Sequence, residues 1–363
     1  MKLIVSDETL RDGEQQVGVN FSMHDKLRIA RKINECGIDQ IAIMPAVSKY
    51  EEILVKELLT TSFKEKIFAS TMLDNKYVDH SHNLGIRNLI LFTSLSDILL
   101  NVKGISKENN ILKAMAVCHY AKNKQMKIFF AGEDSTRAEL KYVIRYIKAI
   151  EKYIEGFILC DTVGVLTPSD TKTLMQKILS KTKCKIGVHF HNDRGMANEN
   201  SLVAIQNGAS MLSATAGGIG ERAGNADYCA VLRRLHVKKE NAGIKNEDLP
   251  DLRELVYKLG GSKPAEPYSD RAFWHESGIH VNALIRNPLS YNSILPKTLH
   301  RKDVFFFGKY SGMSNYKYIF GKKYNEQQLV RIRDWIKELS YKNLTSYTEQ
   351  EVKKLTKRMD FLH

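Results

Sequence analysis

The chain alternates short apolar runs with longer stretches in which apolar residues recur every three or four positions. Short apolar runs are typical of buried strands, and the three-to-four periodicity is typical of amphipathic helices. Eight runs predict strands, at Leu3–Ser6, Asp39–Met44, Lys66–Thr71, Asn88–Thr93, Lys127–Ala131, Gly156–Cys160, Lys185–Phe190 and Met211–Thr215. Helical patterns lie between them, for example at Met23–Cys36, Asn109–Asn123, Arg137–Lys152, Ser169–Ser180 and Asn198–Gln206.

This alternation predicts an α/β fold. Eight strands, each followed by a helix, are typical of a (β/α)8 TIM barrel. An open doubly wound sheet would show the same alternation. No glycine-rich dinucleotide turn follows the first predicted strand, however, which weakens that alternative.

The pattern changes near residue 240. Residues 241–250 predict a loop, Leu252–Leu259 predicts a helix, and the Gly/Pro-rich residues 260–267 predict a linker. From Asn325 to His363 the pattern is helical and highly charged. We therefore expect a barrel domain at residues 1–240, a linking segment at 241–312 and a small helical C-terminal subdomain at 313–363.

Composition limits the possible classes of protein. With 363 residues and 43% hydrophobic content, the chain can bury a sizeable core. The formal charge of +14 is dispersed over predicted helix faces, which indicates a solvated, lysine-rich surface rather than a nucleic-acid binder. Such a surface would still attract an anionic substrate or a phosphate-bearing cofactor. Five scattered cysteines without a CxxC pair indicate reduced thiols. Because no signal peptide and no membrane-spanning apolar stretch is recognisable, we expect a cytoplasmic protein.

The most informative chemical feature is the pair His189 and His191, inside Gly187-Val-His-Phe-His-Asn-Asp193. On a strand, residues two apart point the same way, so both imidazoles share one face near the strand's carboxyl end. Two imidazoles form part of a divalent metal site that needs oxygen ligands to complete it. The alternative is a pair of ordinary hydrogen-bonded strand histidines.

Ionisable residues follow four other predicted strands. In a TIM barrel, the carboxyl ends of the strands form the active-site rim. We therefore expect an active site at that rim. The segments concerned are Ser6-Asp-Glu-Thr-Leu-Arg-Asp-Gly-Glu-Gln-Gln16, Gly132-Glu-Asp134, Cys160-Asp-Thr-Val-Gly164 and Gly217-Gly-Ile-Gly-Glu-Arg-Ala-Gly-Asn225.

Four motifs occur in the chain in the order DETLRDGEQ, HFHNDRGMA, GGIGERAGNA and HESGIHVNAL…NPLSY. Together they resemble the metal-dependent TIM-barrel enzymes that condense acetyl-CoA with 2-oxo acids. That family includes homocitrate, 2-isopropylmalate and citramalate synthases, and the resemblance covers roughly residues 3 to 312. It implies a divalent cation (Mg, Mn, Zn or Co), acetyl-CoA as co-substrate, and a homodimer in which the 241–312 segment crosses to the partner subunit.

The resemblance also implies roles for individual residues. It gives four metal ligands, which are Asp12, His189, His191 and Asn225. It gives four residues around the 2-oxo acid: Arg11 steadies negative charge, Thr162 binds the carboxylate, Gln15 lines the pocket, and Glu133 lies near metal and substrate. It gives two residues for acetyl-CoA activation, which are His280 and Tyr291, with a weaker claim for His275.

The chain differs from many members of the family at positions where an arginine selects an acidic 2-oxo acid. Strand three reads Ala69-Ser-Thr-Met where many relatives carry an arginine, and strand five carries Phe129 and Phe130 where fungal-type homocitrate synthases place one. The chain ends soon after Gly308-Lys-Tyr-Ser-Gly312, without the leucine-binding domain of typical 2-isopropylmalate synthases. In its length and in the form of its motifs, the chain resembles the short homocitrate synthases.

We therefore predict an acyltransferase that converts 2-oxoglutarate and acetyl-CoA into homocitrate and CoA. The alternative acceptors are 2-oxoisovalerate, pyruvate and oxaloacetate, which give 2-isopropylmalate, citramalate and (Re)-citrate. A carbon–carbon lyase on the same scaffold is a further alternative, against which the HESGIHVNAL segment argues. A nucleic-acid binder is disfavoured by the intact metal ligands.

Overall fold

The computed structural model describes residues 2–235 and 243–357 and contains a closed barrel of eight parallel strands. The strands pair in chain order, and β1 closes the barrel by pairing with β8. The barrel predicted from the sequence is therefore confirmed. Its strands are β1 (Ile4–Asp7), β2 (Gln40–Ile43), β3 (Ile67–Met72), β4 (Asn88–Ser94), β5 (Lys127–Glu133), β6 (Gly156–Asp161), β7 (Ile186–Phe190) and β8 (Met211–Ala214).

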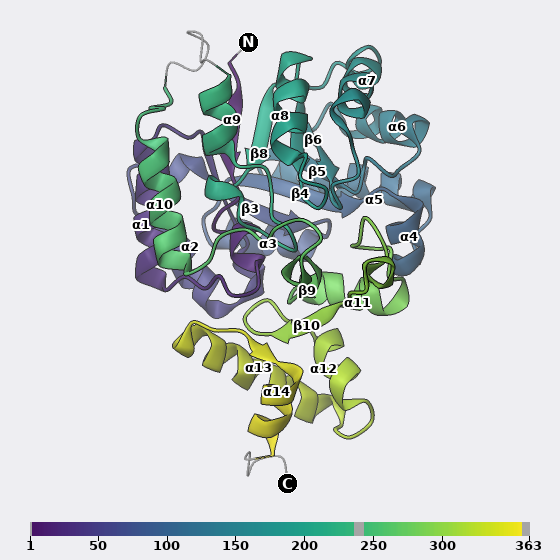
Figure 1. Ribbon diagram of the computed structural model, residues 1–363. Helices are drawn as coiled ribbons and strands as arrows, with labels where there is room; N and C mark the ends of the chain where they lie inside the picture. Colours follow the sequence, from purple (N-terminus) through teal and green to yellow (C-terminus); the bar gives the residue numbers. More distant parts are fainter. Residues whose placement is uncertain (1, 236–242, 358–363) are drawn as a thin grey trace.

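Helices surround the barrel (Figure 1). Ser22 and Thr167 begin two of them with capping boxes, each exchanging hydrogen bonds with an aspartate three residues later. The helices are α1 (Met23–Glu35), α2 (Lys49–Leu59), α3 (Asn75–Asn83), α4 (Asp97–Lys103), α5 (Lys107–Asn123), α6 (Leu140–Ile150), α7 (Pro168–Leu179), α8 (Ala197–Gln206) and α9 (Tyr228–Arg234).

Alternation along the strands separates two apolar layers. Phe129 packs inside the barrel in a cluster with Phe68, at a ring distance of 5.8 Å. Phe130 points outward and stacks on Phe157 between strands and helices. Neither phenylalanine of β5 therefore lines the active-site rim. Ala69 also faces outward, so the neighbouring Ser70 occupies the rim-facing position on β3.

Beyond the barrel strands, α10 (Leu249–Gly260) packs Leu252 and Val256 into the outer core and lies beside α1 (Figure 1). The helix begins earlier than the predicted Leu252 because Pro250 is accepted in its first turn, where an N–H has no partner. Residues 241 and 242 of the predicted loop lie outside the described residues. The domain boundary at residue 240 stays a prediction.

The C-terminal part lies against one end of the barrel (Figure 1). It has its own core around Phe307, Tyr316, Ile332 and Ile336. The predicted helices are present, but a three-stranded sheet of order β11-β10-β9 was not predicted, because strands this short show no alternation. The elements are β9 (Trp274–His275), α11 (Gly278–Arg286), β10 (Val304–Phe307), α12 (Met313–Phe320), α13 (Glu326–Asn343), β11 (Tyr347–Thr348) and α14 (Glu349–Thr356).

Two further findings concern the length and polarity of the helices and the state of the cysteines. None of the helices within residues 2–235 and 243–357 is both long and apolar enough to cross a membrane. All five cysteines are free thiols, four of them buried.

Candidate active site

Three potential metal ligands meet at the carboxyl end of the barrel. His189 and His191 lie on and just after β7, and their Nε2 atoms are 3.3 Å apart. Asp12 follows β1, and its Oδ2 lies 3.3 Å from Nε2 of His189 and 3.7 Å from Nε2 of His191. All three side chains are buried. The predicted alignment of the two histidines on one face is therefore present, and a carboxylate faces it.

Neighbouring groups fix the protonation of these ligands. Nδ1 of His189 lies 3.1 Å from the carbonyl oxygen of Ser213, which can only accept a hydrogen bond. Nδ1 therefore donates to that carbonyl, and Nε2 is the ring nitrogen that faces Asp12. Burial lowers the pKa of His191 well below its usual value. Burial opposes ionisation of Asp12, but Arg11 and the histidines hold its pKa well below the ordinary range.

The residues present fit a divalent metal. Oδ1 of Asp12 and Oδ1 of Asn225 are both buried without a hydrogen-bond partner among the described atoms. Asn225 donates its Nδ2 to the carbonyl of Ile219 at 3.1 Å, which leaves its oxygen as an acceptor. Both side chains lie against Gly220, where a Cβ would approach Asn225 Nδ2 to 2.1 Å. Two imidazole nitrogens and two unsatisfied oxygens form a donor set suited to a divalent cation.

Arg11 lies beside this cluster. Its Nη1 donates to Asp12 Oδ2 at 3.1 Å, and its Nε donates to Glu8 Oε2 at 2.7 Å. Its side chain remains 22% exposed, so part of the guanidinium faces the cavity. A guanidinium fixed by two carboxylates is positioned to donate to an anionic oxygen of a substrate.

Glu133, at the end of β5, forms the opposite wall. It accepts hydrogen bonds from Tyr291, Ser94 and Lys103. Burial alone would raise the pKa of Glu133, but Lys103 and the two hydroxyl donors lower it below its ordinary value. Glu133 is therefore an ionised carboxylate that holds the hydroxyl of Tyr291.

His280 lies between Tyr291 and Glu221. Its ring stacks on Tyr291 with centroids 3.6 Å apart, and its Nδ1 is 2.5 Å from Glu221 Oε2. Burial and Arg222 lower the pKa of His280 well below its usual value. Burial and Asp12 raise the pKa of Glu221. Nδ1 of His280 thus faces Glu221, and Nε2 is the ring nitrogen that remains for a substrate.

Three further predicted residues have distinct positions. The Oγ1 of Thr162 accepts the backbone N–H of Asp134 at 2.8 Å, so its own proton remains for a substrate. Gln15 lines the cavity, as predicted. His275 is bound to Asp303 at 3.1 Å and does not line the cavity. Asp134 pairs with Arg137.

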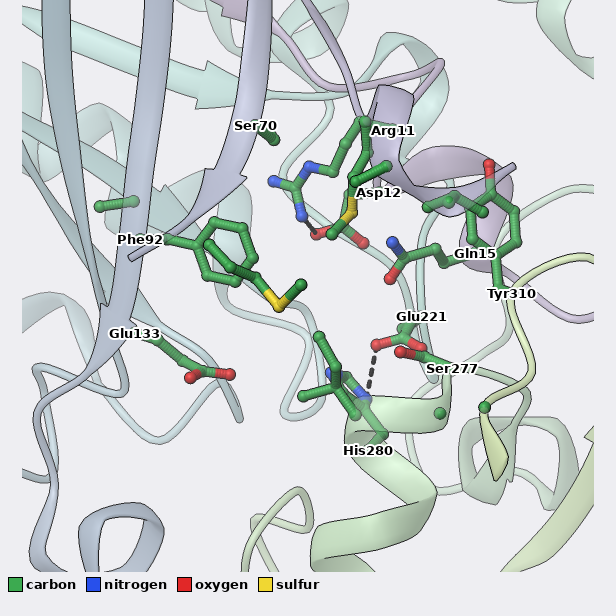
Figure 2. Close-up of a pocket in the computed structure, with 18 of the residues that line it drawn as sticks. Arg11, Asp12, Gln15, Ser70, Phe92, Glu133, Glu221, Ser277, His280 and Tyr310 are labelled. Atoms are coloured by element: carbon green, nitrogen blue, oxygen red, sulfur yellow. Dashed lines mark hydrogen bonds and ion pairs between the residues drawn. The ribbon is translucent and has the colours of Figure 1, made fainter. Parts of the chain in front are cut away.

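Most of these groups line one cavity of about 450 Å³, whereas Asn225, Tyr291 and His275 lie behind its lining. Figure 2 shows Arg11, Asp12 and Gln15 on one side, Phe92 and Glu133 on another, and His280 beside Glu221. Apolar side chains from the ends of β2 to β5 line part of the cavity. They are Met44, Met72, Ile90, Phe92 and Ala131.

Sequence reasoning missed several cavity residues. Glu221 lies within the motif that contains Asn225, so that motif could have suggested it. Lys103 of α4, which pairs with the cavity residue Glu133 without lining the cavity itself, was also missed. Arg333 and Lys337 come from α13 and have no motif of their own. Only the tertiary structure brings that helix to the cavity.

A buried ionic cluster connects the C-terminal part to the barrel. Glu14 contacts Lys309, accepts the hydroxyl of Tyr310 at 2.7 Å, and pairs with Lys26 at 2.5 Å. Lys26 also contacts Glu51 of α2. Tyr310 lines the cavity, and its carbonyl accepts the N–H of Gly278 at 3.0 Å, so the cluster ties the start of α11, which carries His280, to the barrel rim.

Replacing Lys309 with methionine should destabilise the protein by about 3 kcal/mol, because it removes one partner from a buried carboxylate. Equilibrium denaturant unfolding measures this change. The matched control is Lys317→Met, whose ion pair with Glu326 is exposed and should contribute less than about 1 kcal/mol. Equal stability of the two variants would show that the buried cluster contributes nothing beyond a surface pair.

Comparisons with known proteins agree with this architecture. Residues 2–256 match the HMGL-like family model, and residues 268–344 match the family described as homocitrate synthase post-HMGL domain-like. The Bacillus subtilis HMG-CoA lyase structure superimposes with a TM-score of 0.64 at 21% identity, covering 73% of this chain and 96% of that chain. At this identity the likeness shows the fold alone.

Three curated relatives are similar over most of the chain. The homocitrate synthase of Methanocaldococcus jannaschii is 34% identical over 93% of this chain and 86% of its own length. The 2-isopropylmalate synthase of Sulfurisphaera tokodaii is 34% identical over 93% and 91%. The (R)-citramalate synthase of M. jannaschii is 33% identical over 93% and 71%. These near-equal identities do not separate the three acceptors.

Proposed function

Because this chain belongs to the HMGL-like family, we propose that it condenses acetyl-CoA with a 2-oxo acid. The observation that carries the proposal is the cluster of Asp12, His189 and His191 beside Arg11 in one cavity, with the unsatisfied Oδ1 of Asn225 buried nearby. The names of the three curated relatives support the same chemistry. In the reaction, a base takes a proton from the acetyl methyl carbon, this carbon bonds to C2 of the oxo acid, and the former oxo oxygen takes up a proton. Water then hydrolyses the thioester and releases CoA.

The 2-oxo acid would bind at the barrel rim. Asp12, His189, His191 and Asn225 would hold a divalent cation, which when bound acts as a Lewis acid on the 2-oxo group. Thr162 donates its hydroxyl proton to the substrate carboxylate, since its oxygen already accepts from Asp134. Arg11 donates to the C2 oxygen as negative charge develops there.

The acetyl group would lie near His280. The Nε2–H of the neutral imidazole donates to the thioester carbonyl oxygen and stabilises negative charge on it as the methyl proton leaves. Tyr291 stacks on this ring and is itself held by Glu133, so the pair keeps the imidazole oriented. All of these contacts form within one chain here. The homodimer with a crossing segment stays a prediction.

The charges of the residues that line the cavity affect which 2-oxo acid it can accept. The prediction of 2-oxoglutarate requires a cation for its distal carboxylate. Among the described residues that β2 to β5 themselves contribute to the cavity lining, only Glu133 is charged, and the cations that line the cavity are Arg11 after β1 and Arg333 and Lys337 of α13. Burying an unpaired carboxylate there would cost several kcal/mol. We therefore favour an acceptor with a small uncharged side chain, such as pyruvate or 2-oxoisovalerate, over 2-oxoglutarate.

The test is release of free CoA from acetyl-CoA across a panel of 2-oxo acids. We expect kcat/KM for the best uncharged acceptor to exceed that for 2-oxoglutarate by about a hundredfold, roughly 3 kcal/mol. A preference for 2-oxoglutarate would restore the homocitrate assignment. If no 2-oxo acid supports CoA release, the condensation itself is wrong, and cleavage of an acyl-CoA substrate should be assayed instead.

A further inference from the structure

Two basic residues of the C-terminal part reach the same cavity. Arg333 and Lys337 are four residues apart on α13, so they lie on one face of that helix. Both line the cavity that contains Arg11 and the metal-binding residues. Neither is used in the condensation described above. The buried apolar residues of their helix pack in the core of the C-terminal part, and the helix lies outside the barrel (Figure 1).

Lys337 has no carboxylate partner among the described ion pairs. Its Nζ donates only a long hydrogen bond, 3.4 Å, to the carbonyl of Val47 at the end of β2. Burial and the neighbouring Arg333 lower the pKa of Lys337. Arg333 contacts the exposed Asp334, and its side chain is 28% exposed. Two adjacent cations with one exposed counter-charge are suited to a dianionic group.

The two cations lie at the outer end of the cavity. The metal-binding residues at its inner end are buried, whereas Arg333 and Lys337 are partly exposed on a helix beyond the barrel. Acetyl-CoA has its reactive thioester at one end and its phosphates at the other, separated by the pantetheine arm. With the thioester at His280, the phosphates would therefore lie toward the cavity entrance.

We propose that Arg333 and Lys337 form a subsite for the phosphate groups of acetyl-CoA. The inference rests on the proposed function, which supplies acetyl-CoA as the ligand. The subsite would anchor the non-reacting end of the donor while His280 contacts the thioester. Paired cations of this kind recognise phosphate through charge-assisted hydrogen bonds, and part of that attraction is screened by salt.

The test compares binding of CoA and of pantetheine, which lacks the phosphates, by calorimetry on the full chain. Arg333→Gln and Lys337→Gln should each raise the Kd of CoA about tenfold, because each removes a charged hydrogen bond. The Kd of pantetheine should not change. Matched controls on the same helix are Arg331→Gln and Lys342→Gln, which remove equal charge at exposed positions and should leave both Kd values unchanged.

The other possible results would contradict either the phosphate subsite or the proposed function. Equal weakening of CoA and pantetheine would show a structural role for α13 and overturn the subsite. Unchanged CoA binding with a raised KM for 2-oxoglutarate would assign the cations to a distal carboxylate. A wild-type chain that binds CoA no better than pantetheine would also overturn the subsite. If the CoA results hold but no 2-oxo acid is condensed, only the proposed function fails.

Discussion

Replacing either His189 or His191 with alanine should abolish metal binding and lower kcat by about a thousandfold or more. Each substitution removes an imidazole whose Nε2 faces Asp12. Lewis-acid stabilisation contributes several kcal/mol to reactions of this kind, and about 4 kcal/mol corresponds to a thousandfold. Metal content of the purified protein, measured by elemental analysis, gives a readout that does not depend on turnover.

The matched control is His119→Ala, which removes an exposed histidine of α5 and should change neither metal content nor rate. Circular dichroism and unfolding curves establish that the site variants remain folded. Near-normal activity of the His189 or His191 variant at saturating metal would show that the pair is structural. Loss of activity with full metal content would show that the two histidines contact the substrate rather than bind the metal.

Replacing Arg11 with lysine should lower kcat by about a hundredfold while metal content stays close to that of the wild type. Lysine keeps the positive charge but lacks the planar fork that donates to Glu8 and Asp12 while facing the cavity. Removal of a donor to developing negative charge typically costs about a hundred- to a thousandfold. The measurement is steady-state kinetics with both substrates varied.

Arg145→Lys makes the same chemical change at a position where the guanidinium is exposed, and should leave kcat unchanged. If Arg11→Lys lowers metal affinity but keeps kcat at saturating metal, Arg11 acts by holding Asp12 rather than by stabilising charge. A rise in the KM for the oxo acid alone would instead indicate binding of the ground-state carboxylate.

The amino-acid sequence by itself determined the barrel and pointed to the residues proposed to bind a metal. Apolar runs and periodic helices are local patterns, and they repeat often enough to specify the architecture. His189 and His191 are two residues apart on a strand, so their shared face follows from strand geometry alone. Asp12 and Asn225 came from motifs, and the structure places both beside the histidines with unsatisfied oxygens.

Only the tertiary structure decided which strand residues face the cavity. One residue of register separates Ala69 from Ser70, and only Ser70 lines the cavity. Likewise, Phe129 and Phe130 pack in two different cores, and Ala131 lines the cavity instead. Strand ends shift by a residue or two from any sequence prediction, and such a shift reverses the face of a side chain.

Contacts between segments far apart in the chain could not be predicted from the sequence either. Glu221 meets His280, Lys309 meets Glu14, and Lys337 reaches the carbonyl of Val47. No periodicity links positions so far apart, because their proximity depends on how the C-terminal part packs on the barrel. The sequence therefore specified the residues proposed to bind a metal, whereas packing determined the positions of the residues proposed to contact acetyl-CoA.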